Sequence, residues 1–143
     1  MEKNTKLQRT FDKFEKSFGK FREIIESLEL FSFLNEELIV EVATKRFEYT
    51  FESLWKTIKE YLRPQGVECP TPLMAFREAF KAGIIEERFE EIFIEMIDKR
   101  NQIVHVYDFD QDKTIYAFLR GPLIMEALKR VYEKLRVRIG EAV

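Results

Sequence analysis

Residues 7–28 read LQRTFDKFEKSFGKFREIIESL, and their pattern sets the class of structure. Apolar side chains recur at alternating steps of four and three residues, with mostly charged or polar side chains between them. The apolar stripe consists of Leu7, Phe11, Phe14, Phe18, Phe21, Ile25 and Leu28. Because an α-helix completes a turn about every 3.6 residues, this spacing places the stripe on one face. The segment therefore predicts a long amphipathic helix.

A second long helix is expected over residues 36–62, with Asn35 as its cap or as a turn residue. Tyr49 and Trp55 widen its apolar stripe, so this helix is apolar on more than one side. A helix of that kind lies at the centre of a bundle or contacts a partner.

The remaining chain predicts shorter helices. The second helix ends at the segment RPQG of residues 63–66, and a short helix follows over residues 73–81. The next helix carries the apolar residues between Phe89 and Val104, and residues 108–112 predict a polar turn and a helix cap. The last helical region spans residues 113–139, with a break at Gly121-Pro122 because proline lacks an amide donor. No segment has the alternation of a strand. We expect one domain over residues 1–143, an all-α, antiparallel, up-and-down bundle of four or five helices.

Composition narrows the functional classes. The 24 Lys and Arg against 26 Asp and Glu give a net charge of −2, which argues against a broad electrostatic grip on nucleic acid but permits a local site. A single cysteine excludes an intramolecular disulfide and a multi-cysteine zinc site. We expect no secretory leader, no membrane span, no metal and no cofactor, hence a soluble cytoplasmic protein.

Residues 100–108, RNQIVHVYD, form the densest group of side chains with chemical potential. They place the only histidine, His105, near an arginine, an amide, a phenol and a carboxylate. On a helix Arg100 aligns with Phe93, so its guanidinium lies on or beside the apolar stripe. A charge there is costly unless it is paired or borders a cavity or an interface. The residues alone leave open whether Arg100 pairs with a neighbouring helix or belongs to a catalytic cluster.

The cluster suits one reaction, the cleavage of RNA without a metal. That reaction needs a base for the 2′-hydroxyl proton, an acid for the leaving oxygen and a cation to hold charge on phosphorus. Histidine titrates in the right range, and arginine binds phosphate with a forked set of donors. With one histidine per chain, two-histidine chemistry requires a homodimer in which both copies meet at this motif.

The spacing Arg100-x4-His105-x-Tyr107 resembles the RX4HXY motif of HEPN-domain proteins, which are small four- or five-helix bundles. The segment RFEYTFE of residues 46–52, together with Trp55-Lys56 and the HVYD of residues 105–108, is similar to one branch of them. That branch is the nucleotidyltransferase substrate-binding proteins, which are encoded beside a minimal nucleotidyltransferase (MNT). The resemblance covers nearly the whole chain.

The resemblance implies the HEPN toxin of a toxin–antitoxin pair, a homodimer that cuts RNA without metal at a cleft lined by both copies of the motif. Arg100 would contact phosphate, His105 would transfer protons, and Asn101 would fill the polar position after the arginine. The partner MNT nucleotidyltransferase would neutralise the toxin by attaching AMP to Tyr107, which adds negative charge and bulk at the mouth of an RNA cleft.

Other interpretations remain open at this point. One is a non-catalytic substrate-binding or regulatory subunit of a two-component nucleotidyltransferase, and another is a dimerising bundle without a ligand. Tyr107 is also consistent with a tyrosine that packs at a helix end. Glu52 and Lys56 have the spacing of an ordinary helical ion pair, while a further hypothesis has Arg46 or Glu48 brace the Arg100 motif from the second helix.

Overall fold

A computed structural model describes residues 4–103 and 108–142. These residues form six α-helices, which are α1 (Thr5–Glu26), α2 (Glu36–Leu62), α3 (Pro72–Lys81), α4 (Glu90–Ile103), α5 (Phe109–Leu119) and α6 (Pro122–Ala142). Three short 3-10 turns join them, namely η1 (Leu28–Phe31), η2 (Arg63–Gln65) and η3 (Glu87–Phe89). No described residue lies in a strand, and the predicted all-α class is confirmed.

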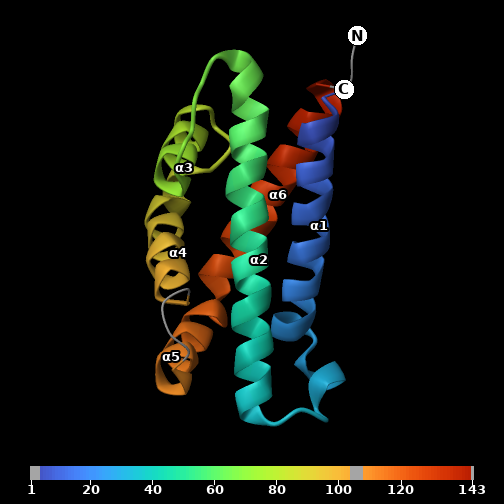
Figure 1. The fold of residues 1–143 in the computed structure, drawn as a ribbon, viewed down its shortest axis with the longest axis vertical. Coiled ribbons are helices and arrows are strands. Elements are labelled where there is room, and N and C mark those ends of the chain that lie inside the picture. The colour runs from blue at the N-terminus through green and yellow to red at the C-terminus, as the bar shows by residue number, and fades with distance from the viewer. Residues whose placement is uncertain (1–3, 104–107, 143) are drawn as a thin grey trace.

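Helix α2 runs through the middle of the bundle (Figure 1). The antiparallel α1 lies along one side of it, α3, α4 and α5 follow one another along the other side, and α6 crosses behind (Figure 1). The predicted central place of the second helix is thus confirmed, since α2 packs against α1, α3, α4 and α5. Because α2 is covered on several sides, some of its hydroxyl groups are buried. Thr44, Thr50 and Thr57 each donate a hydrogen bond to the carbonyl four residues earlier. These local bonds remove the need for partners on other helices.

Polar side chains fix where the helices begin. Asn4, Asn35 and Thr71 accept hydrogen bonds of 2.9 to 3.2 Å from backbone amides in the first turns of α1, α2 and α3. Asp108 caps α5 in the same way, which confirms the predicted cap. The polar turn predicted for residues 108–112 is wrong beyond Asp108, because the helix begins immediately after its cap.

The apolar stripe of α1 is buried from Leu7 to Phe21 as predicted, but its last position differs. Ile24 is fully buried and Ile25 only partly, and the helix ends at Glu26 rather than at Leu28. Ile24 lies three residues after Phe21, so the buried face of α1 ends with two successive steps of three residues, from Phe18 to Phe21 to Ile24, instead of the alternating steps.

Phenylalanine rings connect the helices across the core. The rings of Phe21 and Phe47 join α1 to α2, with centroids 6.0 Å apart. Phe51 on α2 meets Phe76 on α3 edge to face at 5.6 Å, and Phe76 meets Phe93 on α4 at 5.2 Å. Aromatic pairs of this geometry stabilise a core beyond the area they bury. The row of rings therefore fixes α4, and the motif arginine it carries, against α2.

The predicted break at Gly121-Pro122 divides the expected last helix into α5 and α6. Pro122 is the first residue of α6, where a missing amide donor leaves no helical hydrogen bond unmade. Among the described residues no helix is both long and apolar enough to cross a membrane.

Candidate functional site

Arg100 and Asn101 lie in the last turn of α4, beside α2. His105 and Tyr107, the other two residues predicted for the site, lie outside the described residues. The geometry of the candidate site is therefore built from Arg100, Asn101 and the groups around them.

Arg100 is held by three different contacts. Its Nη2 donates to Oε1 of Glu52 on α2, its Nη1 donates to Oδ1 of Asn101 at 3.2 Å, and its Cζ lies 5.4 Å from the centre of the Phe51 ring. The side chains of Arg100 and Glu52 are 24% and 27% exposed. The pairing with a neighbouring helix, one of the two interpretations left open for this guanidinium, is present, and the partner comes from α2. The Nε of Arg100 is buried and has no hydrogen-bond partner in the described part of the chain.

Glu52 is itself fixed on its second oxygen. Its Oε2 accepts a hydrogen bond of 3.1 Å from Nε1 of Trp55 and lies 4.0 Å from Nζ of Lys56. The expected pair with Lys56 therefore exists, but the carboxylate also bridges to Arg100. This bridging role was missed from the sequence. The signal was available, because Glu52 follows the core residue Phe51 and so borders the apolar stripe of α2 as Arg100 borders that of α4.

Neither Arg46 nor Glu48 braces Arg100 through the contacts that the described residues show. Nη1 of Arg46 donates to the backbone oxygen of Lys20 on α1 at 2.9 Å, so its contacts lead away from Arg100. Glu48 pairs with Lys45 at 2.9 Å, one turn earlier on its own helix. Among the described residues Glu52 is the side chain of α2 that forms an ion pair with the motif arginine, and Phe51 contacts it through its ring.

A hollow of about 340 Å³ lies beside Ile103, the last residue of α4. It is lined by Glu41, Thr44, Lys45, Ile103 and Asp112. Asp112 is 7% exposed. Burial raises the pKa of its carboxyl group, and the nearby carboxylates of Asp108 and Glu41 raise it further. This hollow thus holds a carboxyl group whose raised pKa lets it keep its proton to a higher pH than usual.

The pair between Arg100 and Glu52 joins the two sequence segments on which the resemblance rests, residues 46–56 and the start of residues 100–108. The family model described as "Nucleotidyltransferase substrate binding protein like" matches residues 9–137. The chain belongs to this family.

Comparisons with other proteins agree with the fold of this nucleotidyltransferase substrate-binding-like chain. A crystal structure of a protein from Thermus thermophilus superposes with a TM-score of 0.66 at 27% sequence identity. The match covers 88% of this chain and 98% of that one. No protein with a curated description matches significantly.

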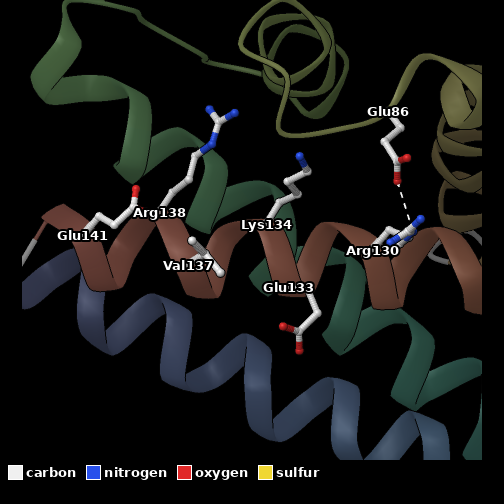
Figure 2. A pocket seen from close by; sticks show the side chains of 7 residues that line it. All are labelled: Glu86, Arg130, Glu133, Lys134, Val137, Arg138 and Glu141. Atoms are coloured by element: carbon white, nitrogen blue, oxygen red, sulfur yellow. Dashed lines mark ion pairs between the residues drawn. The ribbon is translucent and has the colours of Figure 1, made fainter.

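A further hollow of this substrate-binding-like protein lies along α6 and measures about 590 Å³ (Figure 2). Three basic and three acidic side chains line it with Val137, and they are Glu86, Arg130, Glu133, Lys134, Arg138 and Glu141. Arg130 and Glu86 face each other across it, with Nε and Oε2 3.3 Å apart (Figure 2). Its charges balance, and it includes no residue of the predicted motif.

Proposed function

We propose that this protein is a HEPN-type toxin, a metal-independent endoribonuclease that acts as a homodimer and is neutralised by an MNT-type nucleotidyltransferase. The observation that carries the proposal is the state of Arg100. It sits at the motif position five residues before His105, anchored by Glu52 and Phe51, with a quarter of its side chain exposed. An arginine that is rigid and still reachable is suited to hold a phosphate in a fixed place.

In the proposed reaction His105 of one copy removes the proton from a 2′-hydroxyl, and the resulting oxygen attacks the adjacent phosphorus. The bond from phosphorus to the 5′ oxygen breaks, and the partner's His105 protonates that leaving oxygen. The products are a 2′,3′-cyclic phosphate and a 5′-hydroxyl. Arg100 stabilises the charge that develops on the phosphoryl oxygens, and the exposed amide of Asn101 is a second donor beside it.

Neutralisation is proposed to act on the same sequence motif. We expect the partner nucleotidyltransferase to attach AMP to Tyr107, two residues after His105. Each phosphate added there carries negative charge toward the cation that must receive the RNA phosphate. The modified toxin is expected to lose RNA binding as well as cleavage.

The proposal is tested by incubating the purified protein with total RNA in EDTA. Wild type is expected to cleave, and His105→Ala or Arg100→Ala to cleave at least about 100-fold more slowly. Arg136→Ala is the matched control, because this arginine pairs with a glutamate on the exposed surface of α6 and belongs to no predicted site. Intact mass must first show that Tyr107 carries no AMP. Absence of cleavage by unmodified wild type would contradict the ribonuclease proposal.

A second candidate is a non-catalytic, substrate-binding subunit that completes a two-component nucleotidyltransferase. The description of the family favours it, and so does the Arg100–Glu52 pair, because a paired guanidinium is stable in the absence of any phosphate. The expected result under this candidate is nucleotide transfer to a third molecule only when both proteins are mixed. Loss of that transfer in Arg100→Ala, with no RNA cleavage by either protein, would distinguish it from the toxin.

A further inference from the structure

A groove runs between α1 and α2. It consists of two adjoining hollows of about 520 and 260 Å³, which share Lys16, Ser17 and Tyr49 in their lining. Helices α1 and α2 lie side by side and antiparallel (Figure 1), and every residue that lines the two hollows comes from one of these helices. We call this feature the α1–α2 groove.

The groove concentrates positive charge in a chain whose net charge is −2. Six basic residues line it, and they are Lys6, Lys13, Lys16, Lys20, Arg46 and Lys56. Among the described residues of its lining, Glu52 is the only acidic one. A quarter of the 24 Lys and Arg of the chain therefore gathers at one place, and an acidic overall balance conceals a local anion-binding surface.

Three of the six basic groups are already paired. Nζ of Lys6 lies 3.5 Å from Glu60, Nη1 of Arg46 lies 3.8 Å from Glu23, and Lys56 lies beside Glu52. The ammonium groups of the other three, the exposed Lys13, Lys16 and Lys20, form no ion pair with any described residue. These three lysines are therefore the ones available to an external anion.

The three unpaired lysines form a row on α1. Their seven-residue span corresponds to about 10 Å along the helix axis. A strand stacked as in a duplex carries about three phosphates over that length. The row thus matches a run of phosphates better than a single small anion.

Tyr49 favours a nucleic acid over other polyanions. Its side chain is 56% exposed and lines both hollows, so a flat ring stands beside the row of lysines. Aromatic rings next to a basic track are the means by which proteins bind single strands, because unpaired bases stack on them. The hydroxyl side chains of Thr10, Ser17 and Ser53 complete the lining and are too small to block a strand.

The groove and the candidate site share one residue. Glu52 lines the groove and at the same time accepts the hydrogen bond from Arg100. A strand bound to the lysines of α1 would reach the motif arginine by crossing α2 at Glu52.

We infer that the α1–α2 groove is the binding track for single-stranded RNA, held by Lys13, Lys16 and Lys20 and stacked on Tyr49. The inference rests on the proposed function only for what happens to the bound strand, which is cleavage at Arg100 and His105. The binding of the strand does not depend on it.

The test measures binding apart from cleavage. A fluorescently labelled 12-nucleotide RNA of mixed sequence is titrated with the His105→Ala chain in EDTA, and its anisotropy is recorded at several salt concentrations. Adding Lys13→Gln, Lys16→Gln and Lys20→Gln is expected to weaken binding at least about tenfold at low salt. It is also expected to reduce the slope of log affinity against log salt by about two, since about 0.7 is lost per phosphate contact on a single strand.

The matched control removes three lysines from other faces, by Lys81→Gln, Lys129→Gln and Lys134→Gln. The net charge changes equally, so affinity is expected to stay within about twofold if the groove itself binds RNA. Tyr49→Leu is expected to weaken binding by about tenfold with an unchanged salt slope, because stacking releases no counterions. Phe33→Leu, at another exposed ring, is its control and is expected to have no effect.

Several outcomes would overturn the inference. These are equal losses in the groove variant and its lysine control, an unchanged affinity in the groove variant, or equal competition by polyglutamate and by unlabelled RNA. If the wild type cleaves RNA while the groove variant binds and cleaves normally, the groove fails and the ribonuclease stands. If the groove variant alone loses RNA binding but wild type never cleaves, the groove stands and the ribonuclease fails.

Discussion

The α1–α2 groove and the hollow along α6 are similar in size but differ in electrostatic character. Their volumes are about 520 Å³ for the main part of the groove and about 590 Å³ for the hollow. In the α6 hollow three acidic side chains balance three basic ones, and Arg138 is further occupied by a hydrogen bond of 2.7 Å to the carbonyl of Ala82. In the groove a single carboxylate stands among six basic groups.

The difference shows that volume is a poor guide to a binding site in this protein. A hollow whose acidic and basic groups balance offers an incoming anion little net attraction, and at Arg130 an anion must compete with Glu86. Unpaired lysines offer their full charge. The arrangement of charge, rather than the depth of the surface, therefore marks the α1–α2 groove as the place to look for a ligand.

The largest effect on stability is expected from removing the negative charge of an acidic residue, and it is expected to differ between the α1–α2 groove and the α6 hollow. Glu52 and Glu133 each pair with an arginine, but the Glu52–Arg100 side chains are 27% and 24% exposed, whereas those of Glu133 and Arg136 are 57% and 54% exposed. Glu52→Gln leaves a half-buried guanidinium without its counter-charge and is expected to lower the free energy of unfolding by about 1–2 kcal/mol. Glu133→Gln is expected to change it by less than about 0.5 kcal/mol.

Urea unfolding followed by circular dichroism measures both changes. A double-mutant cycle of Glu52→Gln with Arg100→Gln is expected to give a coupling energy near the cost of the single glutamate change, because the two side chains interact directly. Equal losses in Glu52→Gln and Glu133→Gln would show that the partial burial of the Arg100 pair has no energetic weight.

Much of the fold was predictable from the sequence, and the reason is periodicity. The boundaries of α2, the buried stripe of α1 and the break at Gly121-Pro122 follow from spacing and from local chemistry within a few residues. The need of Arg100 for a partner also followed, because its place beside Phe93 on the helix depends on residues of one segment only.

The identity of that partner did not follow from the sequence. Glu52 and Arg100 are 48 residues apart, and which acidic residue of α2 meets α4 depends on how the two helices are rotated against each other. The row of Phe51, Phe76 and Phe93 rings sets that rotation, and it is a property of packing. The α1–α2 groove was not predicted for the same reason, because its basic residues come from two helices. The net negative charge of the whole chain also gave no sign of a local basic surface.

The next-largest expected effect comes from making the α6 hollow more basic, so that its charge becomes similar to that of the groove. Glu133→Gln and Glu141→Gln together leave the hollow with three basic groups and Glu86. In a chain whose groove lysines are already changed to Gln, these two changes are expected to raise the affinity for single-stranded RNA by about threefold at low salt. The gain is small because Arg130 and Arg138 keep their contacts and no exposed ring lines this hollow.

The same anisotropy assay with the labelled RNA measures this change in affinity. Recovery of the full wild-type affinity would mean that charge alone accounts for binding, and it would remove Tyr49 from the argument. No gain at any salt concentration would mean that unpaired charge on this fold does not attract RNA.

The smallest expected effect concerns Asp112, a carboxylate that lines a hollow without an ion-pair partner among the described residues. Its pKa is raised above the ordinary aspartate value of 3.8, first by burial. The folded chain therefore holds this proton more tightly than the unfolded chain, and stability falls as the pH rises through the raised pKa. Asp112→Asn is expected to increase the free energy of unfolding at pH 7 by less than about 1 kcal/mol, with the gain shrinking at pH 4.

Urea unfolding of wild type and Asp112→Asn at both pH values measures the difference, which isolates this group from the other carboxylates. Asp110→Asn is the matched control, because Asp110 is exposed in the same first turn of α5. Its loss removes only a favourable interaction with the helix N-terminus, so it is expected to cost about 0.3–1 kcal/mol at pH 7. A loss of stability in Asp112→Asn as large as that in Asp110→Asn would mean that the helix N-terminus outweighs burial at Asp112. The carboxylate would then stabilise the start of α5 instead of straining it.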